Sequence, residues 1–220
     1  MSERPFEYLP PTEPYLDIRY QDDHIIILDK QAGLLTVPGK DPMHQDCLEN
    51  RVKEKFPEAK TVHRLDMDTS GLVVMGLNKA SHRHLSLQFQ NRNVDKVYEA
   101  LVYGIPDEVS GTIDLPLICD WPNRPKQHVD YERGKKSITN WHLMEKGTDI
   151  GRIHLKPITG RSHQLRVHLM SIGHPILGDR FYADDDAFKM RDRLCLHAKE
   201  LTIMHPVLKE KITFESRVPF

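Results

Sequence analysis

Asp66 and Asp68 lie two residues apart in a short polar segment that leads into the apolar run Leu72–Met75. His63 and Arg64 precede them, and Thr69-Ser70-Gly71 is expected to form a turn after them. Reactive polar side chains in a turn next to a buried strand are typical of a site mounted on a rigid element. The same residues are also compatible with a solvated charged loop, and this segment alone does not decide between the two.

Other chemistries are disfavoured by the motifs of the chain. His163 and His168 are five residues apart and would not share a helix face, and there is no His-Glu-x-x-His motif or Cys/His ligand spacing. Ser70 lacks the Gly-x-Ser-x-Gly pattern of a serine hydrolase, and no Gly-rich phosphate-binding motif is present. The remaining interpretation is a carboxylate site without metal or cofactor, in which Asp66 or Asp68 is the nucleophile or base.

The sequence also places an arginine inside a predicted buried helix, where an unpaired charge is energetically unfavourable. The pattern predicts a helix over 163–172, with Ser162 as its N-cap and apolar residues around most of its surface. Arg166 lies in the middle of this helix, and a buried guanidinium needs a carboxylate partner. Arg166 is therefore the natural charge partner of the carboxylate site, and Tyr98, in an alternating strand predicted over 96–103, offers a phenolic hydroxyl.

The elements around these residues are mostly strands, which predicts an α+β fold. Asp46 is expected to cap a helix of about ten residues, and Asn78 a helix near residues 79–91. Strands are predicted over residues 16–20, 24–28, 72–77, 96–103, 111–118, 137–144, 151–156, 194–204 and 211–215.

The composition is that of a globular protein rather than a disordered one. The 220 residues are 39% hydrophobic and 29% charged, and no apolar run approaches the ~20 residues of a membrane span. Residues 1–15 form a Pro-rich lead-in that does not resemble a secretory signal. Three widely spaced cysteines favour a reducing cytoplasm. Because the net charge is -1, any contact with RNA must come from a local basic face.

The best basic face lies between two predicted strands. Pro122 and Pro125 exclude a helix over residues 120–127, which are therefore expected to form an exposed loop. The segment 124–136 holds five Lys or Arg residues against two acids. Trp121 precedes Arg124 and Lys126, and aromatic groups beside cations suit bases and phosphates. A loop that only improves solubility is the alternative.

At this point the motifs resemble those of the RluA family of RNA pseudouridine synthases. The family signature is matched by His63-Arg64-Leu65-Asp66, followed after two residues by Thr69-Ser70-Gly71. Further blocks occur in the family's order and span most of the chain: residues 29–35, 96–100, 158–168, 173–179 and 194–198. One position departs from the pattern, since Gln31 stands where the family often has proline.

The resemblance implies roles for individual residues. Asp66, rather than Asp68, corresponds to the catalytic aspartate of a reaction that detaches uracil from C1′, rotates it and rejoins it through C5, with no metal or redox cofactor. Whether Asp66 attacks C1′ or C6, or supports a glycal route, stays open. Tyr98 would stack on the uracil, Arg166 would pair with Asp66, and Arg64 would fill the gap that a flipped base leaves.

The resemblance also implies an architecture and a substrate. The expected fold is a twisted, mixed, mainly antiparallel sheet with flanking helices and a central active-site cleft, in one catalytic domain over 16–220 without an S4-type RNA-binding domain. The loop 114–127 is similar to that of the family's dual-specificity member, which predicts uridines in 23S rRNA (conventional position 746) and the tRNA anticodon loop (position 32) as targets. His63, Arg64, Trp121, Arg124, Lys126 and Arg161 are the expected RNA contacts of a cytoplasmic monomer.

Three alternative functions remain at this stage. The chain could act on a different rRNA or tRNA, or it could be a catalytically silent RNA-binding module. A carboxylate-dependent nucleoside hydrolase would instead release free uracil.

Overall fold

The computed structural model describes residues 7–220, and their contacts divide into two compact units. The first unit holds the described residues up to Lys96 together with Ala198–Pro219, and the second holds Val97–His197 with Phe220. Each unit has strands and helices of its own, so the predicted α+β class is confirmed. The six residues at the start of the Pro-rich lead-in lie outside the described part, and the single catalytic domain over 16–220 stays a prediction.

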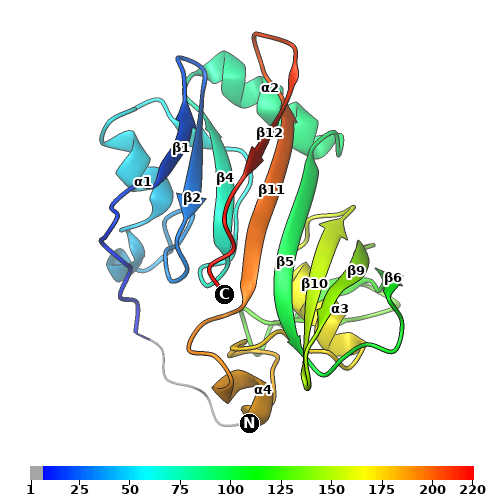
Figure 1. Cartoon of the computed structure of the whole chain (residues 1–220). Coiled ribbons are helices and arrows are strands. Elements are labelled where there is room, and N and C mark those ends of the chain that lie inside the picture. The colour runs from blue at the N-terminus through cyan, green and yellow to red at the C-terminus, as the bar shows by residue number, and fades with distance from the viewer. Residues whose placement is uncertain (1–6) are drawn as a thin grey trace. The chain divides into compact units, whose positions relative to one another are not determined.

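The first unit is built on a sheet with the strand order β1-β2-β4-β11, in which β12 pairs with β11 and β3 pairs with β4 (Figure 1). Strands β2 and β4 are almost entirely buried because their apolar runs contact neighbours on both faces. The strands are β1 (Ile18–Gln21), β2 (Ile25–Lys30), β3 (Lys60–Thr61), β4 (Ser70–Gly76), β11 (Leu196–Met204) and β12 (Lys211–Glu215).

Helix α2 (Lys79–Gln90) covers this sheet as the sequence predicts. Asn78 is its N-cap, and the side chain accepts a hydrogen bond from the Ser81 N–H at 2.9 Å. Leu85 is fully buried in a cluster with Leu72 and Val74 of β4, which fixes the helix against the sheet.

The predicted cap of helix α1 (Leu48–Lys53) is wrong. Cys47 is the N-cap, the helix has six residues instead of about ten, and a 3-10 turn (Pro42–His44) precedes it. The carboxylate of Asp46 instead binds Arg51 through two hydrogen bonds of 2.6 and 2.8 Å. A charged partner with two donors forms stronger bonds than a backbone N–H, so Asp46 serves the buried arginine.

The second unit has an antiparallel sheet with the order β5-β10-β9-β6 and a separate two-stranded sheet, β7-β8. The predicted strand 111–118 is divided in two, because Pro116 has no N–H to donate to a ladder. The strands are β5 (Asp95–Tyr103), β6 (Ser110–Asp114), β7 (Leu117–Cys119), β8 (Gln127–Val129), β9 (Ile138–Lys146) and β10 (Ile150–Pro157).

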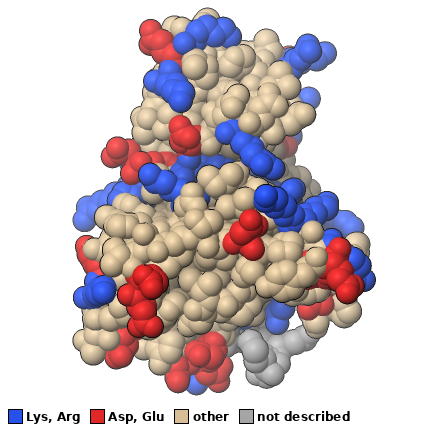
Figure 2. Space-filling view, turned by 90° about the vertical axis from the view of Figure 1, so that its right-hand side faces the viewer, with Lys and Arg blue, Asp and Glu red and all other residues tan. Residues whose placement is uncertain are grey.

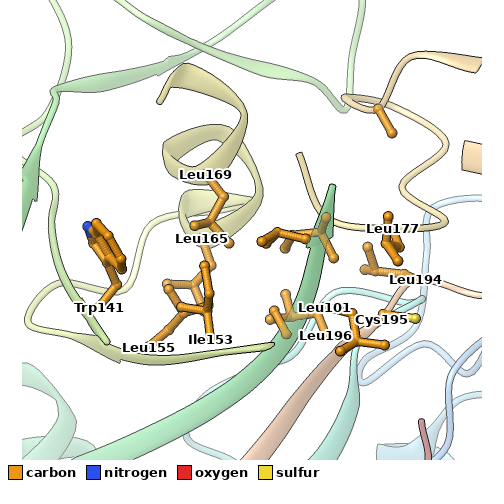
Figure 3. Close-up of a cluster of buried hydrophobic side chains, with 14 of the residues drawn as sticks. Leu101, Trp141, Ile153, Leu155, Leu165, Leu169, Leu177, Leu194, Cys195 and Leu196 are labelled. Atoms are coloured by element: carbon orange, nitrogen blue, oxygen red, sulfur yellow. The ribbon is translucent and has the colours of Figure 1, made fainter. Parts of the chain in front are cut away.

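Helix α3 (Gln164–Ser171) covers one face of this sheet, and the sequence missed the short helix α4 (Asp185–Lys189). Leu165 and Leu169 of α3 point toward Ile153 and Leu155 of β10 in the main core of the unit (Figure 3). The prediction that α3 is largely buried is confirmed. Its predicted cap, Ser162, is wrong: the exposed Ser162 lies one residue too early, and His163 occupies the N-cap.

Candidate functional site

Asp66 begins a β-turn in the first unit. The Thr69 N–H donates to the Asp66 carbonyl at 3.2 Å, so the turn spans Asp66–Thr69 and strand β4 begins immediately after it, at Ser70. The predicted Thr-Ser-Gly turn is therefore displaced toward Asp66, and the buried strand starts two residues earlier than expected. Asp66 and Asp68 are both partly buried, so exposure does not separate their roles.

The backbone on both sides of Asp66 is held by the loop that follows β2. Before it, the Thr36 hydroxyl donates to the Leu65 carbonyl at 2.8 Å and accepts from the Leu65 N–H at 3.2 Å. After it, the Met67 carbonyl accepts from the Lys30 ammonium at 2.9 Å and from the Gly33 N–H at 2.9 Å. These contacts place the Asp66 carboxylate on main chain that is fixed at both neighbours.

Lys30 is the charged centre of this arrangement, and sequence reasoning did not assign it a role. The residue is only 1% exposed, and its ammonium also donates to the carbonyls of Gln31 and Leu34 at 2.8 and 2.7 Å. A buried ammonium that binds carbonyl oxygens orders the chain around it. The available signal was a lysine placed two residues after the last of four apolar strand residues.

The N-terminal segment contacts the same loop. The Gln31 side chain donates to the Pro14 carbonyl at 2.8 Å, and the Tyr8 hydroxyl accepts from the Leu35 N–H at 3.1 Å. Gln31 stands where the family often has proline, which could not donate this bond. In this chain, the described end of the lead-in is thus attached to the loop that holds Asp66.

Position 71, shortly after the turn, requires glycine. Its φ of +114° lies outside the range that L side chains readily adopt. A Cβ there would lie 2.3 Å from the carbonyl oxygen of Ala198 and 2.5 Å from its nitrogen. Because both obstacles are backbone atoms of the neighbouring strand, no larger residue fits at this position.

His63 and Arg64 have different surroundings. The His63 ring stacks on Phe89 with centroids 4.5 Å apart, and its Nε2 accepts a hydrogen bond from the Val74 N–H at 3.1 Å. Burial, and then the positive charge of Lys96, lower the pKa of His63 to about 3. His63 is therefore neutral near pH 7, whereas the Arg64 side chain, two residues before Asp66 in the sequence, is exposed. RNA contact by either residue stays a prediction.

Arg166, in the second unit, has a carboxylate partner that sequence reasoning did not assign. Its Nε and Nη2 bind the two oxygens of Asp179, each at 2.7 Å, and both residues are buried. Burial by itself raises the pKa of Asp179, but the Arg166 charge and the bonds from Arg166 and the Phe181 N–H hold that pKa below its usual value. The signal available in the sequence was a Gly-Asp pair after a buried Ile-Leu.

The remaining predicted catalytic residue, Tyr98, lies on β5 of the second unit. It is partly buried, pairs in register with Leu155 of β10, and packs against the main core cluster. The predicted association of Asp66 with Tyr98 and Arg166 joins residues of different units and stays a prediction.

Residues 120–126, which include the start of the basic segment 124–136, form the tip of the β7-β8 hairpin and are mostly exposed. Trp121 is 66% exposed, and the Arg124 guanidinium lies 4.6 Å from its ring centroid. Lys126 is partly buried at the start of β8, and Arg161 is exposed on the segment before α3. Figure 2 shows one side of the molecule, on which acidic side chains lie among the lysine and arginine side chains. Because the net charge is -1, local groups of cations must supply any contact with phosphate.

Residues 7–220 contain neither a group of side chains suited to a metal ion nor a helix suited to span a membrane. Over this range, no group of three His, Cys, Asp or Glu side chains is arranged to hold a metal ion. Within the same range, no helix has the length and apolar character needed to cross a bilayer.

Comparison with known proteins gives consistent matches. Residues 24–171 match the family described as RNA pseudouridylate synthase. The chain is 53% identical over 214 residues to the Dual-specificity RNA pseudouridine synthase RluA of Escherichia coli (strain K12), covering 97% of this chain and 98% of the relative. It is 49% identical over 215 residues to the protein of the same name from Haemophilus influenzae, with the same coverage.

Solved structures agree with the sequence matches. Human RNA Pseudouridylate Synthase Domain Containing 1 superposes with a TM-score of 0.77 at 29% identity, covering 93% of this chain and 84% of that structure. Human RNA Pseudouridylate Synthase Domain Containing 4 gives a TM-score of 0.73 at 25% identity, covering 92% and 88%. These matches confirm the predicted pseudouridine synthase fold, a mixed sheet with flanking helices, of which there are few. The central active-site cleft stays a prediction.

Proposed function

The chain belongs to the RNA pseudouridylate synthase family and is an isomerase that converts uridine in RNA to pseudouridine; from this premise, we propose that Asp66 is its catalytic carboxylate and that it acts on both rRNA and tRNA. The observation that supports the assignment of Asp66 is the fixed backbone on both of its sides. Catalytic groups must be held within a fraction of an ångström of their productive position. Lys30 and Thr36 provide such support to Asp66 through its two neighbours.

The proposed reaction breaks the N1–C1′ bond, rotates the uracil and forms a C5–C1′ bond. N1 gains a proton, and the hydrogen on C5 is released to solvent, so no redox change occurs. Asp66 participates as an anion, by attack on C1′ or C6 or by supporting a glycal route. Tyr98 stacks on the uracil from the edge of the core of the second unit, where its ring is partly accessible.

Arg166 is proposed to keep the nucleophilic carboxylate ionised and oriented. Its guanidinium has five N–H donors, and the bidentate contact with Asp179 involves Nε and Nη2. A second carboxylate would therefore be compatible with the geometry of the guanidinium. Asp179 would then orient the arginine, and the arginine would orient Asp66.

RNA contacts are proposed for the exposed cations and the aromatic group near them. Arg64 is exposed two residues before Asp66 and stacks into the gap left by the flipped uridine. Trp121 and Arg124, already in contact with each other, present a face on which an unpaired base can stack. Lys126 and Arg161 add charge for phosphates, and the neutral His63 contributes a ring rather than a charge.

The substrate proposal rests on the relatives. The protein from Escherichia coli is named as dual-specific, and it matches this chain over almost the full length of both. We infer the same two targets, a 23S rRNA stem-loop uridine at conventional position 746 and position 32 of the tRNA anticodon loop. The enzyme would work in the cytoplasm as a monomer without a cofactor. Sequencing of pseudouridines in rRNA and tRNA from a deletion strain tests the targets, since both sites must lose the modification.

The catalytic assignment is tested with stem-loop RNA that carries tritium at uracil C5. Asp66→Ala should release no tritium above background, whereas the matched variant Asp68→Ala should retain most of the wild-type rate. Tritium release by Asp66→Ala would remove Asp66 from the mechanism. Chromatography of the product separates the alternatives: free uracil would indicate a hydrolase, and unchanged uridine with normal RNA binding would indicate a silent binding module.

A further inference from the structure

Tyr182 joins two parts of the second unit that the proposed function uses separately. Its hydroxyl accepts a hydrogen bond from the backbone N–H of Gln127 at 2.8 Å, and it lies 2.6 Å from Nδ1 of His163. Gln127 is the first residue of β8, directly after the exposed tip that carries Trp121 and Arg124. Whether the hydroxyl donates to His163 Nδ1 or accepts from it depends on the tautomer of the imidazole, and either bond links the two side chains.

The other end of this connection is the start of helix α3. His163 is the N-cap of α3 with a left-handed backbone (φ 52°) and makes no side-chain capping bond. Its ring stacks on Phe181 with centroids 5.7 Å apart and meets the Tyr182 ring edge-on. The conformation of this helix start is therefore supported by the 181–182 segment, and Arg166 lies three residues further along the same helix.

Tyr182 also belongs to the surroundings of Arg166. Its backbone N–H donates to Asp179 Oδ1 at 3.2 Å, the oxygen that binds Arg166 Nη2. The Arg166 guanidinium lies 5.3 Å from the centroid of the Tyr182 ring and 5.2 Å from that of Phe181. One residue thus contacts the arginine with its ring, the partner of the arginine with its backbone, and the hairpin with its hydroxyl.

We propose that Tyr182 is a positioning residue that fixes the β7-β8 hairpin relative to Arg166, so that RNA held on Trp121 and Arg124 is presented to the catalytic helix in one register. The proposal rests on the proposed role of the hairpin as an RNA contact. The hydroxyl is the part of Tyr182 that makes this connection, because the ring and the backbone face Asp179 and Arg166 instead. Loss of the hydroxyl should leave Arg166 in place and release the hairpin.

The test is a double-mutant cycle on the affinity and turnover of a fluorescent tRNA stem-loop. Tyr182→Phe keeps the ring and backbone contacts and removes the hydroxyl, and Arg124→Ala removes the hairpin cation. In the wild-type background, Arg124→Ala should weaken binding about three- to tenfold. In the Tyr182→Phe background, the same change should weaken binding less than twofold, since a released hairpin no longer presents Arg124 productively. Tyr182→Phe alone should raise KM by about the same factor as Arg124→Ala and change kcat little.

The matched control is Tyr131→Phe, which removes the hydroxyl of a tyrosine that is 78% exposed after β8. This variant should leave the Arg124→Ala effect unchanged. Equal Arg124→Ala effects in the wild-type and Tyr182→Phe backgrounds would overturn the positioning role, as would a Tyr182→Phe protein that is unfolded under the assay conditions. If Arg124→Ala has no effect in the wild type, the proposed RNA contact of the hairpin fails, which is distinguishable from failure of the coupling.

Trp121 gives a second readout that a purely structural role of Tyr182 would not change. The chain has two tryptophans, and the other, Trp141, is buried in the core. The fluorescence anisotropy assigned to Trp121 by subtraction of a Trp121→Phe variant should fall in Tyr182→Phe without RNA. Unchanged anisotropy would show that the hairpin is held without the hydroxyl and would overturn the proposal.

Discussion

The segment around Asp66 and the segment around Arg166 are fixed by different interactions. Near Asp66, an ammonium and a hydroxyl hold backbone carbonyl and N–H groups of the neighbouring residues. Near Arg166, a bidentate ion pair holds the side chain itself, with aromatic rings on the guanidinium. The first arrangement fixes the main chain beside Asp66, whereas the second fixes the side chain of Arg166 in one orientation.

This difference agrees with the proposed roles. A nucleophile must change its bonding during the reaction, so its position is best set through the main chain. A cation that orients another group must stay in place and keep its charge, which a buried carboxylate ensures. The two segments should therefore respond differently to removal of their supporting residues.

The largest effect is expected from Asp179→Asn. This change leaves the Arg166 charge buried without its anionic partner, and it should lower the free energy of unfolding by about 3 kcal/mol. The carboxylate contribution is present above the unfolded-state pKa near 4 and is lost as pH falls through the lowered pKa of folded Asp179. Urea unfolding at pH 7 measures the effect.

A matched control for this change is Asp185→Asn. Asp185 is paired with Lys189 at 3.7 Å on the surface, with both side chains more than 70% exposed. The control should change the free energy of unfolding by less than about 0.5 kcal/mol. Comparable losses for the two variants would contradict the importance of the buried pair.

Lys30→Met should have the next largest effect, mainly on catalysis. The variant removes the ammonium that binds the Met67 carbonyl, which leaves the Gly33 N–H and the Thr36 hydroxyl to hold the backbone around Asp66. We expect kcat to fall about tenfold to a hundredfold with a smaller change in KM, because small misplacement of a catalytic group is costly. Tritium-release kinetics at saturating RNA measure kcat.

Lys60→Met serves as its control, since Lys60 is an exposed lysine on β3 of the same unit. It should leave kcat within about twofold of the wild type. A normal kcat in Lys30→Met would show that Thr36 and the turn itself are sufficient to position Asp66.

The smallest effect concerns His63 and the pH dependence of stability. The pKa of His63 is about 3 in the folded protein and near 6.5 when unfolded, so the unfolded chain binds the extra proton between these values. Stability should fall as pH decreases below about 6.5, by about 2 kcal/mol at pH 5 from this residue. In His63→Gln, which retains an acceptor for the Val74 N–H, urea unfolding should show a weaker dependence between pH 5 and 6.5. An unchanged pH dependence would exclude His63 as its source.

Local sequence patterns were sufficient to predict much of the fold. The apolar run before Lys30 and the run after Gly71 became buried strands, and Asn78 became the N-cap of α2. These features depend on alternation, apolar content and capping preference, which act over a few residues. The family motifs in addition identified Asp66, which no local pattern separated from Asp68.

Tertiary structure decided which polar groups meet. Thr36 binds Leu65 over 29 residues, Lys30 binds Met67 over 37, and Tyr182 binds Gln127 over 55. Asp46 was expected to cap helix α1, but its carboxylate binds Arg51 instead, because the folded chain brings this stronger partner within reach. A buried donor or acceptor must find a partner, but its type does not specify which distant group the folded backbone will bring within about 3 Å. The sequence by itself therefore determined many of the elements and led to the proposed reactive residues, and only the folded chain determined how those residues are held.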